Sequence, residues 1–174
     1  IVFHQAAITN TLHTPASDFY LVNTEYSKKL FKDAVKNKVK KFIYASSCAV
    51  YGKGPFKENF SSPLNDYGIS KLLFDEWVMG QSDLVKIGLR YSNVYGLNEG
   101  HKGKSASMVW QLKEKLINGK TPQLFKWGEQ SRDFVCIDDV VQANLLAMNS
   151  ESGIYNVGSG QNTTFNDLYQ ILSD

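Results

Sequence analysis

The chain has no apolar run approaching the roughly 18 residues that a membrane span requires. It also shows no stretch with the pattern of a secretory signal peptide. The chain also lacks a large excess of charge of either sign, because it has 19 Lys and Arg residues and 17 Asp and Glu residues, a net charge of +2. Such a small excess does not indicate binding to nucleic acid or to an anionic membrane. We therefore expect a cytoplasmic protein with neither a nucleic-acid partner nor a membrane partner.

Cysteine and histidine are also few. The two cysteines, Cys48 and Cys136, lie in apolar stretches and form no CxxC pair. We expect them to be buried, reduced thiols rather than a disulfide or a redox pair. The three histidines, His4, His13 and His101, are too scattered to give the spacing of a metal site. We therefore expect no bound metal.

The rest of the sequence alternates strand-like runs with helical patterns. Runs rich in β-branched and aromatic residues occupy residues 1–7, 40–47, 86–96, 123–127, 133–137 and 154–160. Helical patterns occupy residues 18–38, 65–81 and 105–118, and begin again at Asp138 and Thr164. Strands that alternate with helices in this order predict βαβ units and a parallel sheet. We therefore expect an α/β fold.

The helix expected over residues 65–81 carries the most informative pattern. Asn65 or Asp66 can cap its start. Apolar residues then recur at i, i+3, i+4 and i+8, at Ile69, Leu72, Leu73 and Trp77. This spacing predicts one apolar face along the helix.

Three side chains of one expected strand–helix unit can act together. Tyr67 and Lys71 lie four residues apart and share a helix face. A free phenol has a pKa near ~10, and an ammonium about 4 Å away is expected to lower it by up to about 3 units, offset in part by desolvation. Such a phenol can take the proton of a hydroxyl whose carbon loses hydride. Ser47 ends the preceding strand, where open α/β sheets bind ligands, and can hold the same oxygen.

The same three residues also suit a purely structural interpretation. A tyrosine in the core, a solvated lysine and a serine in a turn would give the same sequence pattern. The YxxxK spacing alone is weak evidence for catalysis. The chemical hypothesis gains weight from the serine at the end of the upstream strand. Both interpretations stay open on these residues alone.

Five segments, in order, resemble the extended short-chain dehydrogenase/reductase family: SSCAVYG, YGISK, LRYSNVYG, RDFVCIDDVVQA and YNVGSG. The resemblance covers nearly the whole chain and implies a nucleotide-sugar enzyme with tightly held NAD or NADP. It also implies a partial Rossmann-like, doubly wound parallel sheet with a small substrate-binding portion. Residues 1–96 are then expected to be the C-terminal part of the NAD(P)-binding domain. Residues 97–174 are expected to form a mixed substrate-binding segment with elements that return to that domain.

A further segment, NVYGLNEGHKGKSASMVWQL (93–112), is similar to the ADP-L-glycero-D-manno-heptose 6-epimerases. The resemblance implies an isomerase that inverts C6 of an ADP-glycero-manno-heptose through a transient ketone, for lipopolysaccharide core synthesis. In that family the lysine of EGHKG is a second catalytic acid/base, which is Lys102 here. The hydroxyl oxygen points in different directions in the two epimers, so one group for each direction, Tyr67 and Lys102, suits this chemistry. Lys102 can alternatively bind phosphate or simply be solvated.

The resemblance also implies binding residues. The expected catalytic set is Ser47, Tyr67, Lys71 and Lys102. Cofactor contacts are expected from Gln5, Ala6, Ala7, Thr9, Asn23, Tyr67, Lys71 and Val94. Contacts to an ADP-sugar substrate are expected from Asn93, Lys104, Gln111, Phe125, Gly128 and Arg132. Arg132 is expected to grip the diphosphate through its guanidinium fork, although a surface ion pair with Asp133 is the alternative.

The departures from the heptose epimerase pattern lie on the substrate side. Leu97-Asn98 stand where that pattern has Pro-Arg, Lys104 where it has serine, Gln111 where it has histidine, and Ser92 where it has phenylalanine. These positions leave the sugar less well specified than the family. Another nucleotide-sugar epimerase or dehydratase of the same family is therefore an alternative.

Glycine is missing where such a fold needs it, because the first glycine of the chain is Gly52. A dinucleotide-binding fold uses a Gly-rich turn after its first strand, so that the backbone can approach the pyrophosphate. We therefore expect that roughly 60 residues or more, at ~30 per βαβ unit, precede this segment in a full-length homo-oligomeric enzyme. Residues 1–174 alone are expected to be inactive, to bind the cofactor poorly and to expose a sheet edge. A non-catalytic relic that binds nucleotide sugars is a further hypothesis, which the complete catalytic set argues against.

Overall fold

The computed structural model describes residues 1–11 and 14–173, which divide into two compact units. The first unit holds residues 1–91, apart from the two undescribed positions, together with Gln142–Val157. The second holds Ser92–Val141 and the chain from Gly158 onward. The expected assignment of these parts to cofactor and substrate binding stays a prediction.

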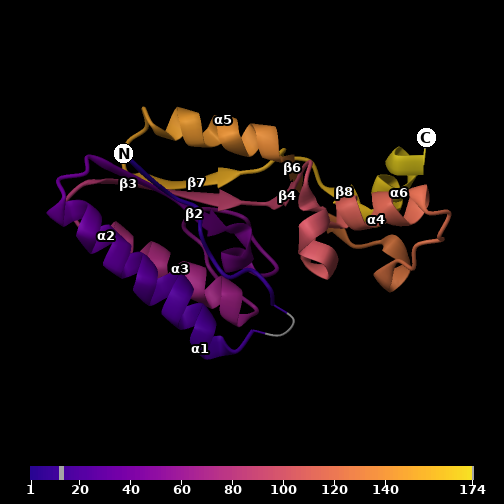
Figure 1. The fold of residues 1–174 in the computed structure, drawn as a ribbon, viewed down its shortest axis with the longest axis horizontal. Coiled ribbons are helices and arrows are strands. Elements are labelled where there is room, and N and C mark those ends of the chain that lie inside the picture. The colour runs from indigo at the N-terminus through magenta and orange to yellow at the C-terminus, as the bar shows by residue number, and fades with distance from the viewer. Residues whose placement is uncertain (12–13, 174) are drawn as a thin grey trace. The chain divides into compact units, whose positions relative to one another are not determined.

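A four-stranded parallel sheet is the framework of the first unit (Figure 1). Its strands run in the order β1 (Val2–His4), β2 (Lys41–Ser47), β3 (Val85–Tyr91) and β7 (Gly153–Val157). Tyr44 of β2 is in register with Gly88 of β3, where a Cβ would lie 2.5 Å from the Tyr44 hydroxyl. The predicted α/β fold with a parallel sheet is confirmed.

The helices of the first unit cover both faces of this sheet (Figure 1). They are α1 (Ala16–Asp18), the π-helical segment η1 (Phe19–Tyr26), α2 (Ser27–Lys36), the 3₁₀ turn η2 (Cys48–Tyr51), α3 (Asp66–Met79) and α5 (Ile137–Ala147), which belongs to this unit from Gln142 onward. Along β2, Phe42 and Tyr44 pack against α2 and α3, whereas Ile43 packs with Ala147 at the end of α5. This alternation follows from the opposite directions of successive strand side chains.

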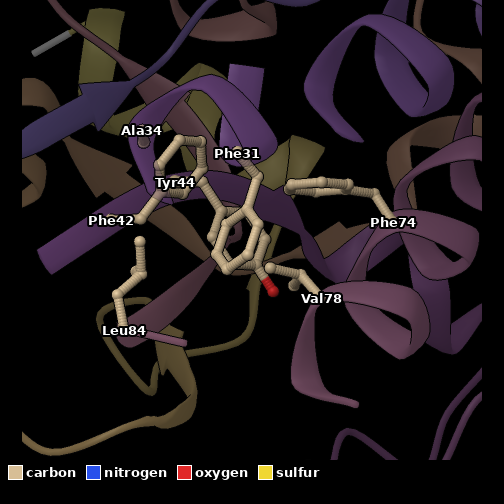
Figure 2. Close-up of a cluster of buried hydrophobic side chains, with 7 residues drawn as sticks. All are labelled: Phe31, Ala34, Phe42, Tyr44, Phe74, Val78 and Leu84. Atoms are coloured by element: carbon tan, nitrogen blue, oxygen red, sulfur yellow. The ribbon is translucent and has the colours of Figure 1, made fainter. Parts of the chain in front are cut away.

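The main core of the first unit is aromatic (Figure 2). It joins residues of α2, β2 and α3 with one residue before β3: Phe31, Ala34, Phe42, Tyr44, Phe74, Val78 and Leu84. The Tyr44 and Phe74 ring centroids lie 4.9 Å apart at 79°, and those of Phe31 and Phe42 lie 5.3 Å apart at 70°. Such edge-to-face pairs add to the free energy that burial of the rings already supplies. The packing holds α3 rigidly against the end of β2.

Helix α3 confirms the predicted cap and corrects the predicted apolar face. The Asn65 side chain accepts a hydrogen bond of 2.8 Å from the Gly68 backbone nitrogen. Ile69 and Leu73, however, are 42% and 39% exposed. The buried face instead carries Gly68, Ser70, Lys71, Phe74, Asp75 and Val78. Polar residues occupy it because partners within the fold satisfy their polar groups, which hydrophobic periodicity cannot show.

The second unit contains two short strand pairs and two helices. Its elements are β4 (Asn93–Tyr95), η3 (Glu99–Ser105), α4 (Met108–Ile117), η4 (Phe125–Gly128), β5 (Ser131–Arg132), β6 (Phe134–Cys136), β8 (Thr163–Thr164) and α6 (Phe165–Ser173). Strand β4 pairs with β6 in parallel, and β5 pairs with β8 antiparallel. Leu112 of α4 packs against Phe165 and Leu168 of α6 to form the core.

Two predicted strands differ from the structure. The run predicted over 86–96 is broken at Ser92, because β3 and β4 belong to different sheets. The run predicted over 123–127 is not a strand: residues 125–128 form a 3₁₀ turn, with Lys126 and Trp127 at φ values of 46° and 58°. Apolar residues in that run matched a strand pattern, but left-handed backbone ends any ladder.

The cysteines and helices bear on two further expectations. Cys48 and Cys136 are both free, but each is half-buried rather than fully buried. The Cys48 thiol donates to the Arg90 carbonyl at 3.3 Å. No helix in the described ranges is long and apolar enough to cross a membrane.

Candidate active site

Ser47 and Tyr67 approach each other where β2 ends and α3 begins. Ser47 is the last residue of β2, and its hydroxyl accepts a bond of 3.1 Å from the Ala49 nitrogen at the start of η2. Tyr67 lies in the first turn of α3, next to Gly68. A Cβ on Gly68 would lie 2.7 Å from the Ala49 carbonyl oxygen, so only glycine lets α3 pack this closely on η2.

The Tyr67 phenol is held in its neutral form. Burial raises the pKa of Tyr67 above its ordinary value, and a hydrogen bond with the Ser47 side chain acts in the opposite direction. The ring packs edge-on against Phe19, with centroids 6.1 Å apart. The expectation that Lys71 lowers this pKa is not met, because the structure directs the ammonium elsewhere.

Lys71 is buried and bonded to the sheet. Its Nζ donates to the Ala45 carbonyl at 2.9 Å and lies 5.9 Å from the centroid of the Tyr67 ring. Burial lowers the pKa of Lys71 to about 8, although the charge of Asp75 acts in the opposite direction. The expected solvated alternative is therefore wrong, since this lysine is 6% exposed.

Behind Lys71 lies a buried ion pair that sequence reasoning missed. The Asp75 carboxylate accepts bonds of 3.0 Å from Arg90 and 2.9 Å from the Ser46 hydroxyl. Arg90 also donates to the Tyr51 hydroxyl at 3.0 Å. The signal that could have revealed Asp75 is its position one helical turn after Lys71, because residues four apart share a face. The pair anchors α3, η2 and β3 to one another.

The segment after β1 supplies the predicted cofactor-facing residues. The Gln5 side chain accepts a 2.9 Å bond from the Tyr91 hydroxyl and donates to Asn144 at 3.1 Å. Ala6 and Thr9 are exposed, and Ala7 is half-buried. This segment leaves β1 at its carboxyl end, the edge at which parallel sheets bind ligands.

Asn23, another predicted cofactor contact, joins the segment after β1 to α3. It is 1% exposed, and its amide bonds the Ile8 nitrogen at 2.8 Å and the Ile8 carbonyl at 3.0 Å. It also donates to the Ser70 hydroxyl at 3.1 Å. Asn23 therefore fixes the segment after β1 to α3, and its contact with the cofactor stays a prediction.

The EGHKG segment belongs to the second unit and carries Lys102 on η3. The Lys102 side chain is 48% exposed, and its Nζ lies 3.5 Å from the Glu99 carboxylate. Lys104 is exposed, and its carbonyl accepts a 3.2 Å bond from Gln111. Gln111 also donates to the Ala106 carbonyl at 2.7 Å, so its amide holds the end of η3.

The remaining predicted substrate residues also lie in the second unit. Arg132 is exposed, and its guanidinium donates to the Ser131 carbonyl at 2.7 Å. The Asp133 carboxylate instead accepts bonds from Ser159 and Gly160 at 2.8 and 3.0 Å. No carboxylate among the described residues pairs with Arg132, so the expected surface ion pair is absent and its charge is available to an anion.

Four other predicted contacts complete this part of the description. Asn93 is exposed and donates to the Asp133 carbonyl at 3.2 Å. Val94 lies in β4, in register with Val135. A Cβ on the buried Gly128 would collide with Asn166. The side chain of Phe125 lies outside the described part of the structure.

The structure thus brings together Ser47, Tyr67 and Lys71 within the first unit, with Asp75 and Arg90 behind them. It places Lys102, Asn93 and Arg132 in the second unit. No group of three or more His, Cys, Asp or Glu side chains in residues 1–11 and 14–173 is arranged to hold a metal ion.

Comparisons with known proteins identify the family of this chain. The model of the NAD dependent epimerase/dehydratase family matches residues 1–158. The chain belongs to that family. A similar solved structure is ADP-L-glycero-D-manno-heptose-6-epimerase from Helicobacter pylori, with a TM-score of 0.92, 45% identity, 98% coverage of this chain and 55% of that chain.

Two 4-epimerases are also similar. UDP-N-acetylglucosamine 4-epimerase from Methanobrevibacter ruminantium has a TM-score of 0.90 and 32% identity over 99% of this chain and 59% of its own. UDP-glucose 4-epimerase from Thermus thermophilus, in complex with NAD, has a TM-score of 0.85 and 29% identity over 98% of this chain and 60% of its own. The chain thus spans little more than half the length of the structures it matches.

The epimerase/dehydratase family is NAD(P)-dependent, and the residues present fit the reactive end of such a cofactor. A phenol, an ammonium and a hydroxyl occur together where β2 meets α3, which is a donor set suited to a ribose and a reacting alcohol. These residues do not include a Gly-rich turn for the pyrophosphate end of the cofactor, since the first glycine is Gly52.

Proposed function

We propose that this chain carries the catalytic side chains of a nucleotide-sugar epimerase that inverts C6 of ADP-glycero-manno-heptose. The observation that supports it most is the cluster of half-buried Ser47 and Tyr67 with buried Lys71, in a chain that also contains the EGHKG segment. The 45% identity to a heptose 6-epimerase over 98% of the chain favours that substrate over a hexose.

The chain's own residues move and hold protons in this proposal. A nicotinamide cofactor held by this chain would supply the hydride acceptor and donor that oxidation and re-reduction of the carbinol carbon require. Tyr67, a neutral phenol in this structure, gives its proton to the ketone oxygen as hydride returns, and takes it back in the reverse reaction. Ser47 holds that oxygen, and Lys71, whose Nζ lies 5.9 Å from the centroid of the Tyr67 ring, contributes positive charge to the site.

Lys102 is proposed as the second acid/base. One group removes the hydroxyl proton as the carbon is oxidised, and the other supplies a proton when the opposite epimer forms. The first group then releases its proton to solvent and the second takes one up, which restores both groups for the next turnover. Arg132 is proposed to bind the diphosphate, because its guanidinium is exposed and has no carboxylate partner in the described ranges. Asn93, Lys104 and Gln111 are proposed to contact the sugar side, and a homo-oligomer is the proposed full-length form.

The test uses the full-length gene product that carries this chain, incubated with ADP-D-glycero-D-manno-heptose and followed by NMR. We expect the C6 signal of the substrate to be replaced by that of the L-glycero epimer. Tyr67→Phe is expected to slow this conversion by about 100-fold or more, the usual contribution of a general acid–base group. Tyr26→Phe is the matched control, because Tyr26 is 55% exposed, and it is expected to leave the rate unchanged.

The second candidate is an epimerase of the same family with a hexose substrate. The substitutions on the substrate side favour it, as does the 32% identity to a UDP-N-acetylglucosamine 4-epimerase. Conversion of UDP-N-acetylglucosamine or UDP-glucose, with no change at C6 of the heptose, would select it. If neither kind of substrate reacts but the protein binds nucleotide sugars, the non-catalytic hypothesis replaces both.

A further inference from the structure

Glu99 is a buried carboxylate in the EGHKG segment to which neither the resemblance nor the proposed mechanism gives a role. It is 5% exposed, although it lies on a short turn between exposed residues. Carboxylates are almost never this buried unless they are paired or hydrogen-bonded. Its neighbours therefore indicate what it does.

Both oxygens of Glu99 are engaged by backbone and side chain on either side of η3. Oε1 accepts bonds from the Gly96 nitrogen at 3.0 Å and the Ser107 hydroxyl at 2.8 Å. Oε2 accepts a bond from the Ser107 nitrogen at 2.8 Å. One side chain thus closes the loop that begins after β4 and ends at the cap of α4, where Ser107 also accepts from the Trp110 nitrogen.

The same Oε2 atom lies 3.5 Å from Nζ of Lys102. Burial on its own raises the pKa of the Glu99 carboxyl, but the bonds from Ser107 and Gly96 and the charge of Lys102 together hold that pKa below its ordinary value. Glu99 is therefore an anion with a fixed position. Lys102 is the cation that faces it, on a side chain that is otherwise 48% exposed.

We propose that Glu99 is a positioning residue that fixes the ammonium of Lys102 by holding the loop closed and pairing with Nζ. This inference rests on the proposed role of Lys102 in catalysis. A lysine side chain has four rotatable bonds, and an exposed one samples many directions. A carboxylate anchored by three hydrogen bonds limits that freedom and keeps the ammonium near one direction of approach.

Glutamine cannot replace glutamate in this arrangement. An amide has one acceptor oxygen, and its nitrogen would face the Ser107 nitrogen or the Lys102 ammonium as a second donor. Glu99→Gln therefore removes the pairing with Lys102 while nearly preserving volume. Ser107→Ala is the matched control, because it removes the hydroxyl that Glu99 and Trp110 share but leaves the carboxylate beside Lys102.

The experiment is a double-mutant cycle on the full-length gene product, with kcat and KM measured on ADP-D-glycero-D-manno-heptose. We expect Glu99→Gln to lower kcat at least tenfold with KM within about threefold, and Ser107→Ala to lower the Tm but leave kcat within about twofold. We expect the double variant Glu99→Gln/Lys102→Met to be no slower than Lys102→Met alone. The same cycle with Glu99→Asp, which keeps the charge but shortens the reach, covers the case in which Glu99→Gln does not fold.

Each outcome decides a different point. Multiplying losses in the double variant would overturn the inference, because Glu99 would then act independently of Lys102. So would an unchanged kcat in both Glu99 variants. Full activity of Lys102→Met would instead show that the proposed role of Lys102 is wrong, whatever Glu99 does.

Discussion

Two residues of the candidate site have pKa values that are shifted in opposite directions from their ordinary values. Burial raises the pKa of Tyr67 and lowers that of Lys71 to about 8. Opposite shifts of this kind are frequent at catalytic sites, where the environment separates acid from base. Here the cause is physical and local: both side chains sit between α3 and the end of β2.

Lys71 provides a direct prediction. In protein without cofactor, NMR of ¹³C-labelled lysine is expected to show one side chain that titrates near pH 8, and this signal should be absent from Lys71→Met. The reason is that burial penalises the ammonium more than Asp75 supports it. If every lysine titrated above pH 10, the buried position of Lys71 would be contradicted.

His4 gives a second prediction, for stability. Burial, together with the charge of Lys71, lowers the pKa of His4 from 6.5 to about 4. Between these pH values the unfolded chain holds a proton that the folded chain does not, so the free energy of unfolding decreases as pH falls from 6.5 to 4.

Thermal unfolding midpoints across this pH range test that expectation. His4→Gln can keep a bond to the Ser27 hydroxyl, which lies 2.7 Å from His4 Nε2, but it cannot titrate. The midpoint of His4→Gln is expected to fall less between pH 6.5 and 4 than that of the unchanged protein. Parallel decreases in the two proteins would show that His4 does not contribute.

At the scale of elements, the start of α3 determines how the site is assembled. Gly68 lets this helix lie against η2, and the Asn65 side chain caps it. Gly68→Ala is expected to lower stability by about 1–3 kcal/mol, because its Cβ would overlap the Ala49 carbonyl and force α3 away. It is also expected to slow turnover, since Tyr67 would shift relative to Ser47.

Urea unfolding and kcat of Gly68→Ala measure these two effects. Gly80→Ala is the control within the same region, because the nearest atom to its Cβ would be 3.4 Å away. Gly80→Ala is expected to be nearly neutral in both measurements. Equal behaviour of the two variants would contradict the close approach of α3 to η2.

The same helix shows how far the sequence could predict the fold. The start of α3 and the cap by Asn65 followed from local chemistry, as did the strand that ends at Ser47. The buried face of α3 did not, because Lys71 and Asp75 are buried through partners on β2 and β3 that lie far away in sequence. The sequence did not predict the 3₁₀ turn at residues 125–128 either. Lys126 and Trp127 have positive φ values there, and neither is a glycine that would have marked the turn.

The candidate site was predictable to the same extent. Ser47, Tyr67 and Lys71 could be chosen from spacing and from the end of a strand. The direction in which the pKa of Tyr67 shifts could not be predicted, because it depends on burial and on where Lys71 places its ammonium. Nothing in the sequence beyond its place in EGHKG indicated that Glu99 is buried. Its burial and its hydrogen bonds to Gly96 and Ser107 are evident only in the structure.

At the scale of the whole molecule, the chain spans 55% to 60% of the epimerases that it matches. We predict that residues 1–174 alone bind NAD or NADP weakly, because these residues include no Gly-rich turn after a first strand to receive the pyrophosphate. Calorimetric titration of this segment and of the full-length gene product compares the two affinities. Equally tight binding by both would contradict this expectation.

We propose that C6 is inverted by oxidation and re-reduction, with protons exchanged only at oxygen. The most direct measurement is to run the full-length gene product on ADP-D-glycero-D-manno-heptose in D₂O and examine C6 of the product by NMR. We expect an epimer with hydrogen, not deuterium, at C6, because hydride leaves and returns without contact with solvent. Deuterium at C6 would contradict it and would show that the carbon had lost a proton instead.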